Sequence, residues 1–249
     1  MKPILVVWED EDYSALHTVL CRALEHLYPE SFATTRARDL LHPESANGYG
    51  GFKPFLAIGK QWHTARNKGK RYQGKAFTPE SALCILDADK AAEAIPSASA
   101  APSAPADLEI WRSQVVASWT SQLRIGAHEP DRVSGEILLW NRESVMLAVF
   151  PPEGIPADLS SELGWGDADD RWQEALRTCG NAAPTSSTEY RHEYRKPLRC
   201  LNDHLQLKKR GAQSSVILKA GSKPHLIAGL LDRCPDLRAI AEAAHQLMA

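Results

Sequence analysis

Two apolar runs along the chain predict buried strands, and each run ends in acidic residues. The first run covers 3–8 and is followed at once by Glu9 and three further acids. The second covers 82–86 and ends in Asp87. Short continuous apolar runs are typical of strands buried on both faces of a parallel sheet. We therefore expect acidic side chains at the carboxyl ends of two buried strands.

Other segments have apolar residues at helical spacing. The clearest is 16–27, and similar patterns predict helices over 108–123, 225–231 and 236–248. An apolar run over 137–140 suggests a third strand. Strands that alternate with helices are typical of α/β proteins. The predicted fold is an α/β domain with a mostly parallel sheet flanked by helices.

Composition suggests how the chain is organised around this domain. We assign 1–150 to the α/β domain, with 45–79 as a basic insertion. Within it, 91–106 is nearly all Ala, Ser and Pro, the composition of a linker or loop. Residues 151–249 are expected to form a helical C-terminal extension packed on the domain.

Composition also bears on the environment of the protein. No apolar run approaches the roughly 20 residues that a membrane span needs. The N-terminus lacks the apolar region of a signal peptide. The five cysteines are odd in number and lack C-x-x-C spacing, which argues against a disulfide framework and a zinc knuckle. We expect a cytoplasmic protein without a membrane partner.

The formal net charge of −2 conceals an uneven distribution of charged residues. From 45 to 79 the chain has no Asp or Glu but seven Lys and Arg residues, interleaved with Trp62, His63 and Tyr72. Cations neutralise phosphates and flat rings stack on bases, so this pattern favours a nucleic-acid partner, DNA more than RNA. The alternative is a solvated loop. The cations expected to contact nucleic acid are Lys60, Arg66, Lys68, Lys70, Arg71 and Lys75.

The acids at the strand ends form a candidate metal site. Glu9 follows the first predicted strand, and Asp87 and Asp89 follow the second. In open α/β sheets, functional groups gather outside the carboxyl ends of the strands. Three converging carboxylates repel one another, so a divalent cation is the natural neutraliser, and oxygen ligands favour Mg²⁺ or Mn²⁺. The structural alternative is that these acids stabilise the first turns of helices.

The same residues carry a resemblance to a known family. The segment 6–12 (VVWEDED) before an amphipathic helix, together with 85–89 (ILDAD), resembles the TOPRIM fold of topoisomerases, bacterial primases and OLD-type nucleases. That family places a Glu after its first strand and an Asp-x-Asp after a later one, which bind Mg²⁺. Glu9 matches the first motif, and Asp87 and Asp89 match the second. The resemblance covers roughly the first 90 residues.

The resemblance implies a Mg²⁺-dependent nuclease in which Glu9, Asp87 and Asp89 are catalytic metal ligands. Glu143 begins a stretch that is similar to a further acidic position in small stand-alone TOPRIM proteins, many of them found near bacterial defence genes. The resemblance therefore also implies a role in antiviral defence and an ATPase supplied by a partner chain, as in OLD-type systems. Asp10 stands where the family usually has Gly. This difference leaves open the alternative that the chain is a catalytically degenerate subunit that binds nucleic acid or a partner. The chain could also form a homo-oligomer.

A receiver domain of a signalling relay is the third alternative. The acidic pair Glu9-Asp10 after a strand is similar to the start of a receiver. A receiver then needs a phospho-accepting Asp after the next-but-one strand. Asp39 is the only Asp between Asp12 and Asp87, and no apolar strand leads into it. The sequence therefore makes this alternative less favoured than the nuclease.

Overall fold

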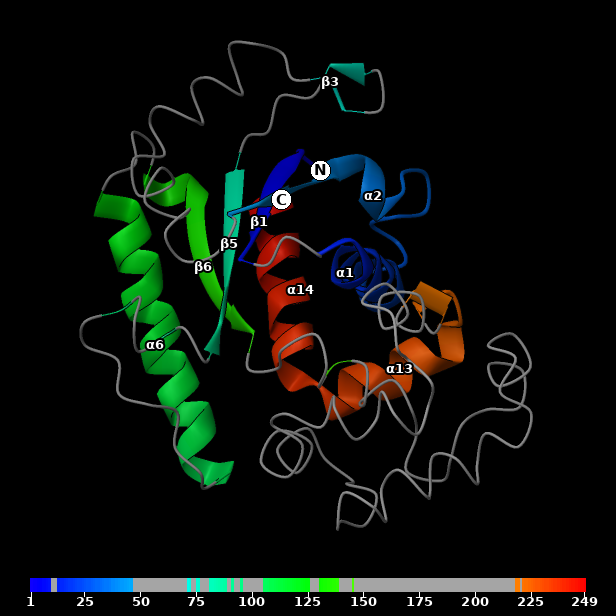
Figure 1. Ribbon diagram of the computed structural model, residues 1–249. Coiled ribbons are helices and arrows are strands. Elements are labelled where there is room, and N and C mark those ends of the chain that lie inside the picture. Colours follow the sequence, from blue (N-terminus) through cyan, green and yellow to red (C-terminus); the bar gives the residue numbers. More distant parts are fainter. Residues whose placement is uncertain are drawn as a thin grey trace, which may run out of the picture.

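The chain forms an α/β domain in three layers, with helices on both faces of a parallel sheet (Figure 1). The structure is a computed structural model. It describes residues 1–9, 13–46, 71–72, 75–76, 81–88, 91, 95, 105–125, 130–138, 145, 218–219 and 221–249.

The sheet contains β1 (Ile4–Trp8), β2 (Leu41–Ser45), β5 (Ser81–Asp87) and β6 (Val133–Leu138). Their spatial order is β2-β1-β5-β6, and every neighbouring pair is parallel. Trp8 at the end of β1 lies opposite Ser45 of β2 and Ile85 of β5. The carboxyl ends of the strands therefore meet at one edge of the sheet. The predicted mostly parallel sheet flanked by helices is confirmed.

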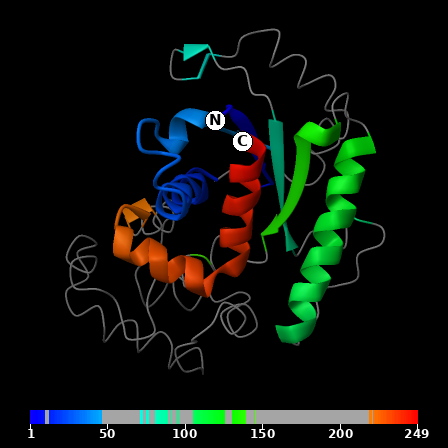
Figure 2. The same cartoon turned by 180° about the vertical axis from the view of Figure 1, so that it is seen from behind.

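Within the described part of the chain, helices cover both faces of the sheet (Figure 2). The first face carries α1 (Ser14–Leu27) and α14 (Pro235–Met248), and α13 (Pro224–Arg233) packs against these two helices. The second carries α6 (Pro105–Ile125). The short helix α2 (Ala37–Leu40) immediately precedes β2.

Alternation along the strands explains the apolar runs of the sequence. Ile4, Val6 and Trp8 of β1 belong to the core under α1, α13 and α14. Leu5 and Val7 point to the opposite core under α6. Because both faces are covered, every residue of β1 is buried and needs to be apolar.

Helix α6 also covers the outer edge of β6. Thr120 accepts a hydrogen bond from the Gly135 N–H (2.9 Å) and donates one to the Gly135 carbonyl (3.2 Å). Arg124 Nε donates to the Val133 carbonyl (3.0 Å). A Cβ at Gly135 would overlap with the ring of Trp119, so glycine permits this close approach. These side chains satisfy backbone groups that an edge strand would otherwise expose.

Some element boundaries differ from those predicted. Strand β2 was not expected, because Pro43 interrupts it and only Leu41 and His42 are buried. Proline is tolerated there because β2 pairs on one side only within the described sheet. Strand β6 begins at Val133 rather than 137, since polar residues occupy its middle.

Two predicted segments are described only in part. In the segment 91–106, Ala91 and Ile95 are fully buried in the core under α6, and Ile95 N–H donates to the Ala91 carbonyl (2.9 Å). Pro105, near its end, already belongs to α6. In the segment 151–249, the described helix α14 packs on the sheet, and α13 packs on α1 and α14; residues 151–217 lie outside the described part.

The amino-terminal side of the sheet is also where α14 ends. The Lys2 N–H donates to the Met248 carbonyl (2.8 Å), so β1 begins beside the last turn of α14.

Among the helices described, none combines the length and the apolar character needed to cross a membrane.

Candidate functional site

The sheet reverses its winding between β1 and β5. The chain leaves β1 through α1, on one face, and continues to β2 on one side of β1. It leaves β5 through α6, on the other face, and continues to β6 in the opposite direction. Such a switch point opens a crevice outside the carboxyl ends of the two central strands, and ligands of open α/β proteins bind there.

Glu9 and Asp87 lie at this switch point and are in direct contact. Glu9 directly follows β1, and Asp87 is the last residue of β5. Glu9 Oε2 accepts a hydrogen bond from the Asp87 backbone N–H at 3.0 Å. The Glu9 N–H in turn donates to the Ile85 carbonyl (3.2 Å). The structure thus brings together two of the predicted site residues, 78 positions apart in sequence.

Burial differs between these two acids. Glu9 is only 8% exposed, whereas Asp87 is partly open to solvent. A carboxylate as buried as that of Glu9 needs hydrogen bonds or positive charge around it, and the Asp87 N–H supplies one such bond. The hydrogen bond fixes the Glu9 carboxylate at the end of β5, next to the more accessible acid.

The donor chemistry of this pair suits a hard divalent cation. Both side chains offer carboxylate oxygens, the ligands that Mg²⁺ prefers, and Asp87 leaves access for the waters that Mg²⁺ retains. The other two predicted ligands, Asp89 and Glu143, lie outside the described residues. Within the described part of the chain, no three His, Cys, Asp or Glu residues form a group that could hold a metal ion. The pair therefore fits part of a magnesium site.

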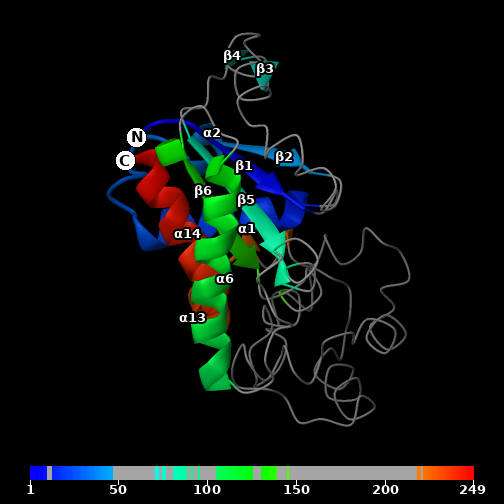
Figure 3. The same ribbon diagram turned by 90° about the vertical axis from the view of Figure 1, so that its left-hand side faces the viewer.

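Of the cations predicted to bind nucleic acid, those in the described part of the chain do not lie next to the Glu9–Asp87 pair. Arg71 and Lys75 belong to an antiparallel hairpin of β3 (Arg71–Tyr72) and β4 (Lys75–Ala76). This hairpin lies beyond the amino-terminal end of β5 (Figures 1 and 3). Asp87 is at the other end of β5, and a strand rises about 3.3 Å per residue, so roughly 20 Å separates the two ends. Lys60, Arg66, Lys68 and Lys70 lie outside the described residues.

Within the described segment 13–46, no strand leads into Asp39, as predicted from the sequence. Asp39 lies in α2, before β2, and therefore not at the carboxyl end of a strand. Because β2 was not expected, the next strand of the four-stranded sheet was not recognised as its third strand in chain order. That strand is β5, and its last residue is Asp87, beside Glu9.

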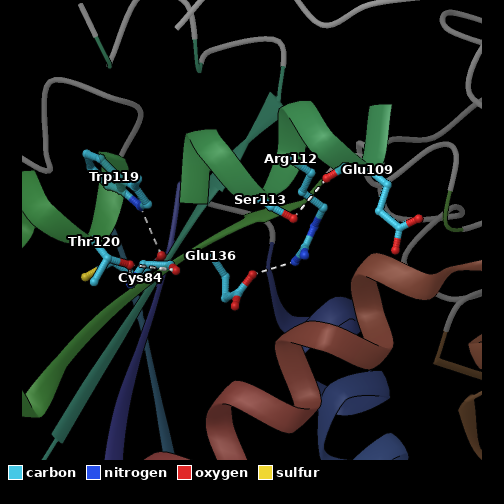
Figure 4. A network of polar contacts seen from close by, with 8 residues as sticks. Cys84, Glu109, Arg112, Ser113, Trp119, Thr120 and Glu136 are labelled. Atoms are coloured by element: carbon cyan, nitrogen blue, oxygen red, sulfur yellow. Dashed lines mark hydrogen bonds and ion pairs between the residues drawn. The ribbon is translucent and has the colours of Figure 1, made fainter. Parts of the chain in front are cut away.

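A buried ion pair that the sequence analysis did not predict joins α6 to β6 (Figure 4). Arg112 Nη2 donates to Glu136 Oε2, and Glu136 is only 8% exposed. Burial raises the pKa of Glu136, the Arg112 guanidinium opposes that rise, and the buried Asp236 of α14 adds to it. The predicted strand 137–140 excluded Glu136, so only the alternation of β6 from Val133 would have indicated it.

Other buried titratable groups are held in their neutral forms. Burial lowers the pKa of His17 to about 4, and its ring meets Trp8 edge to face. Burial raises the pKa of the Cys21 and Cys84 thiols to about 12. Thiols with raised pKa values are poor nucleophiles and poor metal ligands at neutral pH. Neither these thiols nor His17 extends the acidic site.

Comparisons with protein-family models, with curated proteins and with solved structures gave no significant match. The functional argument for this chain therefore depends on the geometry of the Glu9–Asp87 pair and on its place in the sheet.

Proposed function

We propose that the chain is a TOPRIM-like, Mg²⁺-dependent nuclease that cleaves phosphodiester bonds of DNA or RNA. The observation that carries the proposal is the contact of Glu9 with Asp87 at the switch point between β1 and β5. Acids from two separate sequence motifs lie side by side at the position where ligands of such sheets bind.

Glu9, Asp87 and Asp89 are the proposed metal-binding catalytic residues, with Glu143 as a ligand for a second ion. Bound Mg²⁺ would polarise the scissile phosphate, activate water and offset charge on the leaving oxygen. The chain's own contribution is to hold the carboxylates. The Asp87 N–H orients Glu9, and β1 and β5 fix both residues through their parallel pairing.

A cleavage assay with Mg²⁺ or Mn²⁺ on plasmid and single-stranded substrates tests this proposal. Glu9→Gln keeps an oxygen that accepts the Asp87 N–H, and Asp87→Asn keeps its backbone N–H, so both variants retain the observed contact. We expect each to lower the cleavage rate at least about 100-fold. Glu109→Gln, on the exposed face of α6, is the matched control and should cleave normally.

Mn²⁺ binding, followed by electron paramagnetic resonance, gives a second measurement that does not depend on turnover. Glu9→Gln and Asp87→Asn should weaken Mn²⁺ binding, and Glu109→Gln should not. Cleavage that is unaffected by both site variants would exclude this site. If no variant and no wild-type preparation cleaves, but Lys68→Ala/Arg71→Ala abolishes nucleic-acid binding, the chain is a degenerate binding subunit.

One observation favours a receiver-like signalling domain as a second candidate. Asp87 ends the third strand, in chain order, of the four-stranded sheet and lies beside an acid that follows β1, as a phospho-accepting Asp would. Incubation with acetyl phosphate, followed by intact-mass measurement, tests this candidate. A phosphoryl adduct that Asp87→Asn removes and Asp39→Asn retains would support it. If the wild-type protein forms no phosphoryl adduct, the receiver-like candidate is excluded.

A further inference from the structure

The amino-terminal side of the sheet carries a cleft that the Glu9–Asp87 site does not use. The cleft has a volume of about 500 Å³ and lies between the end of α1 and the segment 29–36 that leads to α2. Helix α1 starts after the carboxyl end of β1 and runs back along the sheet. Its last turns therefore lie near the amino-terminal ends of the strands, whereas Glu9 lies at their carboxyl ends. The lining residues that carry the argument are Arg22, Glu25, Phe32, Thr34, Thr35 and Arg36.

The charged groups of this cleft are two guanidinium groups and one carboxylate. The carboxylate, Glu25, is already engaged at both oxygens: Arg22 Nη1 donates to Oε2 (2.8 Å) and the Ala37 N–H donates to Oε1 (3.2 Å). Glu25 therefore holds Arg22 in place and takes one of its five N–H donors. Arg36 is exposed and has no ion-pair partner among the described residues.

The wall of the cleft is held by helix α14. The rings of Tyr28 and His245 stack with centroids 3.7 Å apart, and Ser31 Oγ lies 3.1 Å from His245 Nε2. Phe32 packs against the core, and its N–H donates to the Tyr28 carbonyl (3.3 Å). Because these contacts already order the segment, little further ordering is required on binding.

We propose that this cleft binds a phosphate group, through the guanidinium groups of Arg22 and Arg36 and the hydroxyl groups of Thr34 and Thr35. Guanidinium groups match the geometry of phosphate oxygens, and hydroxyl groups donate to the same oxygens. The volume is within the range of small-molecule sites. The phosphate can come from a free nucleotide or from a nucleic-acid backbone, which present the same chemistry.

The test uses the full chain in the presence of EDTA, so that no divalent metal contributes. Inorganic phosphate, adenosine monophosphate and a single-stranded oligonucleotide are the probes, with amide chemical shifts and calorimetry as the measurements. We expect the amides of 32–36 to shift. Arg22→Gln and Arg36→Gln should each weaken binding by about tenfold or more. Arg38→Gln, an exposed arginine of α2 that does not line the cleft, is the matched control and should bind normally.

Further variants separate binding from folding and one phosphate source from the other. Arg36 and Thr34 are exposed, so Arg36→Gln and Thr34→Ala should fold even if Arg22→Gln, which releases Glu25, does not. Arg36→Lys should restore binding only in part. Saturable binding of adenosine monophosphate supports a free-nucleotide site, and binding of the oligonucleotide alone supports a backbone site.

Two results would overturn the proposal. One is the absence of shifts in 32–36 with every probe at about 10 mM, a concentration that fills even a site of millimolar affinity. The other is an equal loss of binding in Arg38→Gln and Arg36→Gln, which would indicate general charge attraction. Because the probes bind without divalent metal and the residues differ from Glu9 and Asp87, failure here leaves the nuclease proposal unaffected.

Discussion

His17 shows how one buried side chain couples folding to pH. Its pKa falls from 6.5 to about 4 because burial disfavours the charged ring, and its neighbours are Trp8, Cys21 and His42. Below pH 6.5 the unfolded chain takes up a proton at this position, and the folded chain does not until the pH approaches 4. Acid therefore favours unfolding in this window.

The expected loss of stability between pH 6.5 and pH 4 from His17 is roughly 3 kcal/mol. Urea unfolding at several pH values measures it. His17→Gln should remove this part of the pH dependence, whatever its effect on absolute stability. His26→Gln, at an exposed position of the same helix, should leave the dependence as in the wild type. If the free energy of unfolding depends on pH equally in both variants, the prediction is contradicted.

The Arg112–Glu136 pair has the opposite sign of pH dependence. Burial raises the pKa of Glu136 above its usual value, and Arg112 limits the rise. Glu136 therefore contributes stability below the unfolded pKa, near 4.5, and that contribution is lost as the pH rises through the folded pKa. Removing Arg112 would leave the buried carboxylate without its cation.

We expect Arg112→Met to destabilise the fold by about 1–3 kcal/mol at pH 7, and by less at pH 5, where Glu136 more readily takes up a proton. Denaturant unfolding at both pH values measures this difference. Adding Glu136→Gln to Arg112→Met should recover part of the loss at pH 7. A loss of the same size at both pH values, with no recovery in the double variant, would contradict the prediction.

At the scale of elements, the contact of α6 with β6 depends on a glycine. Gly135 lies where the Trp119 ring crosses the strand, and Trp119 Nε1 donates to the Cys84 carbonyl of β5 (3.2 Å; Figure 4). Trp119 is fully buried and held by that hydrogen bond, so it has little room to move. A methyl group at Gly135 must therefore displace α6.

Gly135→Ala should cost about 1–3 kcal/mol through overpacking. Gly229→Ala is the matched control, because the added methyl group there meets only the Arg233 side chain, which can move. In the interior of α13, alanine should stabilise by up to about 1 kcal/mol. Thermal unfolding of both variants checks the pair of predictions, and equal melting temperatures would show that α6 adjusts freely.

The elements also show what could be predicted from the sequence. Strands β1 and β5 were predicted because both their faces are buried, so their apolar runs are continuous. Strand β2 was not, because only its first two residues are buried. The start of β6 was predicted too late because Ser134 and Glu136 interrupt its apolar pattern, and Glu136 is buried in an ion pair with Arg112 of α6. Edge strands depend on their neighbours, and a single sequence does not give the neighbours.

The same limit applied to the site. The sequence indicated that Glu9 and Asp87 each follow a strand, but it did not give the order of the strands. Their contact depends on β1 and β5 being adjacent, with Trp8 opposite Ile85. Asp39 was considered as the phospho-acceptor because it is the only Asp between Asp12 and Asp87; with β2 in the sheet, Asp87 ends the third strand of that sheet in chain order. Asp89 and Glu143 lie outside the described residues and stay predictions.

At the scale of the whole molecule, the hairpin and the acidic pair lie at opposite ends of the sheet. A substrate that contacts both, under the nuclease proposal, must extend over roughly 20 Å, or about six nucleotides at 3.4 Å each. We expect cleavage rates to rise with oligonucleotide length up to at least this size. Arg71→Ala/Lys75→Ala should slow the cleavage of long substrates and leave short ones unaffected. Equal rates for dinucleotides and long strands would contradict this prediction.

The arrangement of the sheet also has a consequence for biosynthesis. Strand β1 leaves the ribosome well before its partners, because Ile4 pairs with Leu41 and Ser81. The helix α14 that covers it spans Pro235–Met248. At about 5–20 residues per second, the nascent chain carries this apolar strand without its cover for on the order of ten seconds or more. The nascent chain should therefore bind chaperones, and the yield of folded protein should rise with chaperone concentration.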